Sequence, residues 1–133
     1  MRTVACRLRR GEDIYKSLQR LAQEENVSAG CIICMVGCVT EARIRRAGGD
    51  KVMELAGPLE IVSATGTVSK ERIHVHVSLA DRELCVSGGH MKEGCLTDTT
   101  VEVVIAVMDN MRFSKEFDES TGYHELKIQA LEE

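Results

Sequence analysis

Apolar residues alternate with polar ones in several short stretches of the chain, a period of two that is typical of strands with one buried face. The clearest case covers residues 73–79, where four apolar residues alternate with His74, His76 and Ser78. The pattern predicts that the apolar side chains face the core. It also predicts that the two histidines share the opposite face of the strand.

Further strands are expected before and after this one. A nearly continuous apolar run at residues 29–39 predicts a buried central strand, and β-branched residues dominate residues 99–108. Gly57-Pro58 is interpreted as the break that opens a new strand. The central strand is expected to continue with alternating character through residues 41–46, and shorter strands are expected at residues 3–9, 52–55, 59–68, 84–87, 111–117 and 123–131.

One segment has helical periodicity instead. An apolar stripe recurs at i, i+4, i+7 and i+8 in Ile14, Leu18, Leu21 and Ala22. The acidic pair Glu12-Asp13 is suited to a helix start, and the helix is expected to end near Asn26. One amphipathic helix near the start and a run of short strands predict a single α+β domain over residues 1–133, with a mostly antiparallel sheet covered by the N-terminal helix.

Composition narrows the function classes. The chain is 44% hydrophobic and 3% aromatic, so its core must consist mainly of aliphatic residues. A net charge of −4 argues against the broad basic surface that phosphate neutralisation needs, so DNA binding by the chain alone is not expected.

No apolar run is long enough for a membrane span or a secretory leader, which predicts an intracellular, cytoplasmic protein, or a nuclear one in a eukaryote. The six cysteines are then expected to be free thiols.

Three of the four histidines, His74, His76 and His90, are close together in the sequence. His90 follows Gly88-Gly89, which we expect to let the backbone bend toward the other two. Neutral imidazole suits Zn, Fe, Ni or Cu, and three such ligands leave one position open for water or substrate. We therefore predict a divalent transition metal here, zinc first, with iron or nickel as alternatives. The competing interpretation is a polar strand face whose histidines only form hydrogen bonds.

Two carboxylates interrupt apolar strands and are candidates for a catalytic base. Glu102 lies within the β-branched run, and Glu60 lies between Leu59 and Ile61. If its strand neighbours the histidines, such a carboxylate could orient an imidazole or act as a base on bound water. The alternative is that it faces solvent or a subunit interface. The basic cluster at residues 43–46 is interpreted as a solvated strand face.

The order of these motifs resembles that of the Plants and Prokaryotes Conserved (PPC) domain. The resemblance extends over essentially the whole chain. It rests mainly on GPLEIVSATGT at residues 57–67, HVHVSLAD at 74–81, VSGGHM at 86–91 and TVEVVI at 100–105.

The resemblance implies an α+β fold that assembles as a homotrimer. It also implies a metal site, because the histidine pattern of the family matches His74, His76 and His90 position for position. Plant members follow a minor-groove-reading AT-hook, and stand-alone relatives are labelled DNA-binding by association with them. No Arg-Gly-Arg core occurs here, so a stand-alone form without the hook is expected.

Two functions remain open. The first is a homotrimer with a three-histidine metal or small-ligand site, where any reaction would be hydrolysis or lyase chemistry through metal-bound water. The second is a non-enzymatic regulatory or assembly module that recruits protein partners or binds DNA weakly. Whether the protein is an enzyme is left open by the sequence.

Overall fold

The computed structural model describes residues 1–132, in which eight strands and one helix follow one another along the chain. In order they are β1 (Arg2–Arg9), α1 (Ile14–Glu24), β2 (Gly30–Arg45), β3 (Val52–Val68), β4 (Ile73–Ala80), β5 (Val86–Met91), β6 (Leu96–Val107), β7 (Met111–Asp118) and β8 (Tyr123–Ala130). The predicted α+β class, with one short helix, is confirmed. Among these residues, no helix has the length and apolar character that crossing a bilayer requires.

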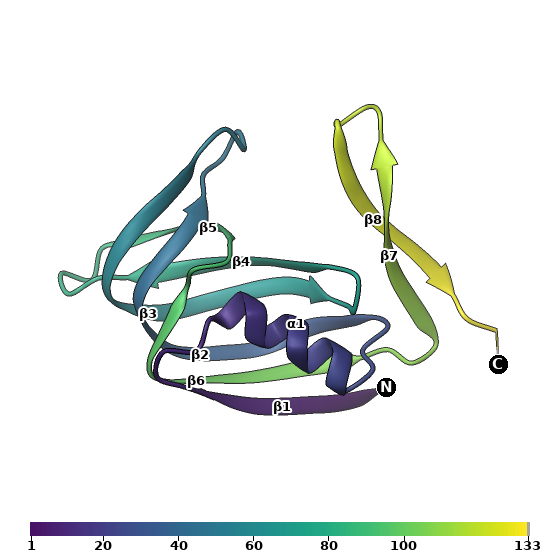
Figure 1. The fold of residues 1–133 in the computed structure, drawn as a ribbon, viewed down its shortest axis with the longest axis horizontal. Helices are drawn as coiled ribbons and strands as arrows, with labels where there is room; N and C mark the ends of the chain where they lie inside the picture. The colour runs from purple at the N-terminus through teal and green to yellow at the C-terminus, as the bar shows by residue number, and fades with distance from the viewer. Residues whose placement is uncertain (133) are drawn as a thin grey trace.

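The strands form two sheets (Figure 1). Six of them pair antiparallel in the order β1-β6-β2-β3-β4-β5, and the far end of β2 also pairs with β5. β7 and β8 form a separate hairpin that projects from the rest of the molecule (Figure 1). The second pairing of β2 is important for the site, because it places Arg45 opposite His90.

The core follows the alternation of the strands. Val75 and Val77 of β4 are buried, as the period of two predicts, and Val103 and Ile105 of β6 are buried as well. The apolar stripe of α1 belongs to the same core cluster, through Ile14, Leu18 and Ala22. Aliphatic side chains thus fill the interior, as expected for a chain with few aromatic residues.

The prediction of a strand break at Gly57-Pro58 was wrong, because β3 continues through both residues. The register between β2 and β3 shifts at this point, where Val39 faces Leu59 but Glu41 faces Ala56. Proline cannot donate to a strand ladder and is tolerated at such bulges. A side chain at position 57 would collide with the carbonyl oxygen of Thr40, so glycine is required there. The central strand predicted at 29–39 and its alternating continuation at 41–46 form one strand, β2.

Helix α1 begins where its acidic cap predicts. The side chain of Asp13 accepts hydrogen bonds from the backbone N–H of Lys16 at 3.1 Å and of Gly94 at 2.8 Å. The first of these satisfies a free N–H at the helix start. The helix ends at Glu24, slightly earlier than predicted, and Asn26 then adopts a left-handed backbone conformation with φ of 49°.

Replacing Glu12 with glutamine is expected to lower the free energy of unfolding by about 0.5–1 kcal/mol at pH 7. Its carboxylate accepts a hydrogen bond from the Arg9 N–H at 2.7 Å and one from Arg20 Nη2 at 2.9 Å. These two contacts, the Arg9 N–H first, hold the pKa of Glu12 below its ordinary value. Because the pKa of Glu12 is lower in the folded state than in the unfolded state, its carboxylate stabilises the fold at pH values above its ordinary pKa. This stabilisation is lost as the pH falls through the folded-state pKa.

Urea unfolding of the wild type and of Glu12→Gln at pH 7 and at acidic pH measures this effect. The difference between the two proteins should narrow at acidic pH. Glu83→Gln is the matched control, because Glu83 is exposed and its carboxylate makes no ion pair within 4.0 Å among the described residues. If the two proteins differed equally in free energy of unfolding at both pH values, the stabilising role assigned to the ionised Glu12 carboxylate would be contradicted.

Candidate metal centre

Two adjacent strands bring the three histidines together. β4 presents His74 and His76 on the same face, opposite the buried Val75. β5 runs antiparallel to β4 and places His90 directly opposite His76. The ring centroids lie 5.1 Å apart for His74–His76, 4.9 Å for His74–His90 and 5.4 Å for His76–His90. One nitrogen from each ring lies within 4.8 Å of the other two, so the three side chains converge as the sequence predicts.

The two glycines before His90 act differently from the prediction. They do not form a bend, because Gly88 and Gly89 both lie within β5. A Cβ at position 88 would collide with the carbonyl oxygen of Val77, and one at position 89 would lie 2.8 Å from the carbonyl oxygen of Arg45. The glycines therefore allow β5 to lie tightly against β4 and β2, and this close approach positions His90.

The surroundings of His74 and His90 favour neutral imidazole. Burial, assisted by the Arg45 cation, lowers the pKa of His90 to about 4. Burial and the nearby Arg72 cation also lower the pKa of His74. Both rings are therefore neutral at pH 7, and the neutral ring is the form that can bind a metal ion.

Two arginines contact the outer nitrogens of the rings. Arg72 Nη2 donates to His74 Nδ1 at 3.1 Å, and Arg45 Nη2 donates to His90 Nδ1 at 3.3 Å. A guanidinium group can only donate, so each Nδ1 must be unprotonated and the ring proton must lie on Nε2. His74 Nε2 then donates to His76 Nε2, 3.2 Å away. The arginines thus determine where the protons of the cluster lie.

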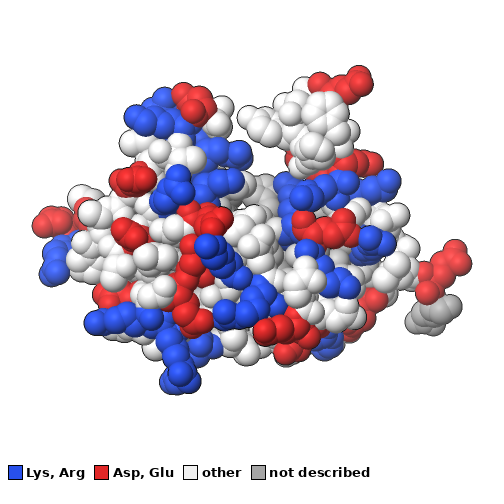
Figure 2. Space-filling model, viewed as in Figure 1, with Lys and Arg blue, Asp and Glu red and all other residues white. Residues whose placement is uncertain are grey.

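A cavity of about 390 Å³ adjoins the cluster and is lined by His74 and His90. Its other walls come from α1, the loop between β3 and β4, and the β7–β8 hairpin. Tyr123 reaches from the hairpin toward β2, with its ring 5.8 Å from Arg45 Cζ. Figure 2 shows a hollow between two projections of the molecule, with Lys and Arg side chains on both sides.

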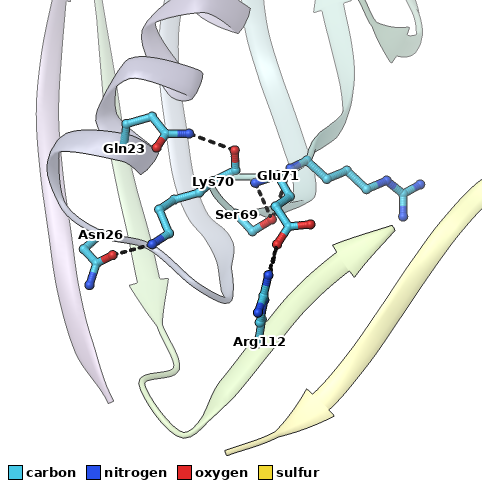
Figure 3. A network of polar contacts seen from close by, with 7 residues as sticks. Gln23, Asn26, Ser69, Lys70, Glu71 and Arg112 are labelled. Carbon is cyan, nitrogen blue, oxygen red and sulfur yellow. Dashed lines mark hydrogen bonds and ion pairs between the residues drawn. The ribbon is translucent and has the colours of Figure 1, made fainter. Parts of the chain in front are cut away.

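The loop that carries Arg72 is held by a polar network between α1 and β7 (Figure 3). Ser69 is buried, and its Oγ accepts hydrogen bonds from the backbone N–H groups of Glu71 at 3.2 Å and Arg72 at 3.1 Å. Arg112 of β7 donates to the Glu71 carboxylate at 2.6 Å. Gln23 of α1 donates to the carbonyl oxygen of Lys70 at 2.9 Å. These contacts fix the start of the histidine strand.

The structure does not bring either candidate base to the histidines. Glu102 is exposed on β6, opposite Arg7 of β1, and β2 and β3 separate β6 from β4. Glu60 is exposed opposite Ala80, at the end of β4 farthest from His74. The condition for a catalytic role, a strand position beside the histidines, is therefore not met. Glu125 of β8 does line the cavity, and sequence reasoning missed it.

The interpretation of the basic cluster was wrong for one of its three residues. Arg43 and Arg46 are exposed, and Arg46 forms an ion pair with Asp50 at 2.8 Å. Arg45 is half-buried and contacts His90. Only the long-range register of β2 with β5 produces this contact, so no local sequence pattern could have indicated it.

Known proteins share this fold. A solved structure of a hypothetical protein from Salmonella enterica superimposes with a TM-score of 0.93 at 32% identity, covering 97% of this chain and 94% of that one. A metal-containing protein from Archaeoglobus fulgidus gives a TM-score of 0.79 at 26% identity, covering 96% and 94%. A structure from Bacteroides thetaiotaomicron, described only as a candidate DNA-binding protein, gives 0.84 at 18% identity, covering 94% and 91%, which shows the fold alone.

Sequence comparison agrees with the structural likeness. The Bifunctional protein GlmU of a Synechococcus strain (JA-3-3Ab) is 35% identical over all 133 residues of this chain, which spans only 21% of that relative's length. The family model of the Plants and Prokaryotes Conserved domain matches residues 1–109. This chain therefore belongs to the Plants and Prokaryotes Conserved domain family.

Proposed function

We propose that His74, His76 and His90 bind a divalent transition metal, zinc first, with iron or nickel as alternatives. The observation that carries the proposal is the convergence of one nitrogen from each ring within 4.8 Å. Neutral imidazoles on two rigid strands suit such an ion. The Archaeoglobus fulgidus relative, described as metal-containing, adds support at 26% identity.

A metal held by three protein ligands keeps a position open for water or substrate, and it would supply Lewis-acid polarisation or a water of lowered pKa. The residues that line the cavity then surround the place where a substrate would react. His74 and His90 line the cavity, so a ligand in it lies beside the centre. Glu125 replaces Glu60 and Glu102 as the candidate base, because it lines the same cavity. Hydrolysis or a lyase reaction is the chemistry that this arrangement supports best.

Metal analysis of protein purified without added metal tests the proposal. About one zinc, iron or nickel ion per chain is expected, and a chelator should lower the melting temperature, since an ion that binds only the folded state stabilises it. A protein that contains no such metal, takes up none when it is supplied, and melts at the same temperature with and without chelator would refute the metal site.

We further propose that the protein is a homotrimer. The family resemblance implies this state, and large apolar side chains lie exposed on the hairpin and on the main sheet. Phe117 and Ile128 of the hairpin are 58% and 62% exposed, and Ile33 and Val62 of the sheet are 57% and 54% exposed. Exposed apolar groups of this kind are common at protein interfaces.

Light scattering should give three times the chain mass of 14.7 kDa. Ile128→Ser should weaken the assembly, because it removes apolar area from the hairpin, whereas Gln129→Ser on the same strand should not. A mass of 14.7 kDa across the micromolar range would contradict the trimer.

The second candidate function is a non-enzymatic assembly or regulatory module. The observation that favours it is that a related sequence forms about a fifth of a much longer protein. Contact with DNA by this chain alone is not expected, because its net charge is −4 and acidic and basic side chains are interspersed on the face in Figure 2. A duplex titration at two salt concentrations tests this, since phosphate contacts weaken as salt rises.

A further inference from the structure

The contacts of the two arginines cannot persist when the histidines bind a metal through Nε2. A neutral ring that ligates through Nε2 carries its proton on Nδ1. This N–H would then face the N–H groups of Arg72 at His74, and those of Arg45 at His90, where the present distances are 3.1 and 3.3 Å. Two donors cannot satisfy each other, so each guanidinium needs a new acceptor.

Within the described residues, a carboxylate lies within 4.0 Å of only one of the two arginines. Arg72 Nη2 lies 4.0 Å from the Glu125 carboxylate and can turn toward it. Arg45 has no carboxylate within 4.0 Å among residues 1–132. Arg45 is half-buried and lines the cavity, so its guanidinium is then free to bind a ligand there.

The cavity beside Arg45 carries more positive than negative charge. Lys92 and Lys115 also line it, and neither forms an ion pair within 4.0 Å in the described part of the chain. The lining carboxylate Glu71 is already paired with Arg112 at 2.6 Å. In a protein of net charge −4, this local excess of cations needs an explanation.

We propose that the cavity binds a small oxyanion, the carboxylate or phosphate group of a metabolite-sized ligand, with Arg45 as its main contact. The guanidinium fork matches the two oxygens of such a group, and the two lysines add charge. A volume of about 390 Å³ is of the size that small-molecule sites have. The inference rests on the proposed metal centre, because metal binding is what releases Arg45 from His90.

Metal and anion should therefore strengthen each other's binding. The metal releases Arg45, the anion supplies its new acceptor, and the coupling must be equal in both directions. A purely structural Arg45, one that only orients His90, would give no such coupling. If Arg45 had only that structural role, replacing it would change metal affinity by the same factor whether or not an anion is present.

Isothermal titration of zinc into the protein tests this at constant ionic strength, with chloride, acetate or inorganic phosphate as the anion. We expect acetate or phosphate to tighten zinc binding by at least about fivefold in the wild type. The anion that does so identifies the ligand group as carboxylate or phosphate. Complexes between zinc and free anion would weaken the apparent affinity, so they cannot imitate the expected result.

Arg45→Gln should abolish the tightening, and Arg46→Gln should retain it. Arg46 is the matched control, because it is the next residue and is exposed and paired with Asp50. Circular dichroism and thermal unfolding establish that both variants fold. Zinc binding that no anion alters, or that anions tighten equally in Arg45→Gln, overturns the inference and leaves the metal centre standing. A wild type that binds no zinc at all overturns the metal centre and this inference together.

Discussion

Replacing His76 with alanine is expected to weaken zinc binding by more than about 100-fold. Losing a direct ligand should cost at least as much as the 10–100-fold that the loss of a supporting contact typically costs. The side chain of His76 is exposed, whereas its neighbours Val75 and Val77 are buried and hold the strand. The substitution should therefore remove a ligand without unfolding β4.

His124→Ala is the matched control for this experiment. His124 is the fourth histidine, and it lines the same cavity from the hairpin but lies outside the convergent cluster. Competition with a chromophoric chelator measures zinc affinity in the wild type and both variants. Equal losses in the two variants would show that zinc binds elsewhere, or that any histidine near the cavity suffices.

Local sequence patterns predicted the parts of the fold that depend on neighbouring residues. The alternation around Val75 and Val77 correctly indicated which face of β4 is buried, because side-chain direction in a strand follows directly from position. The Asp13 cap correctly marked the start of α1. The three-histidine cluster was also predictable, since β4 and β5 are successive strands joined by a short turn.

Features that depend on long-range register were not predictable in this way. Arg45 is distant from His90 in the sequence, and only the second pairing of β2 brings them together. The two alternatives for Glu102 could not be separated for the same reason, because strand order decides whether a carboxylate reaches the histidines. Glu125 comes from a hairpin outside the main sheet. The sequence thus indicated the three histidines that converge, while the cations and the carboxylate around them required the folded structure.

Replacing Gly88 with alanine is expected to lower the free energy of unfolding by about 2–3 kcal/mol and also to weaken zinc binding. A Cβ at this position would meet the carbonyl oxygen of Val77 and would lie 3.0 Å from the Cα of Ser78. These are backbone atoms of the paired strand, so no side-chain rotation can relieve the contact. β5 would have to move away from β4, and His90 would move with it, because the residue lies in the same short strand opposite His76.

Ser87→Ala is the matched control, because it places alanine one position earlier on β5, at an exposed site opposite Leu79. Urea unfolding and zinc titration of both variants separate two explanations of how His90 is positioned. If close packing of β5 against β4 positions the ring, Gly88→Ala loses both stability and zinc affinity, whereas Ser87→Ala retains both. If the contact between Arg45 and His90 suffices to hold the ring, Gly88→Ala loses stability but binds zinc as the wild type does. The first result is the one expected, because a single hydrogen bond of 3.3 Å contributes less than the strand ladder that carries the residue.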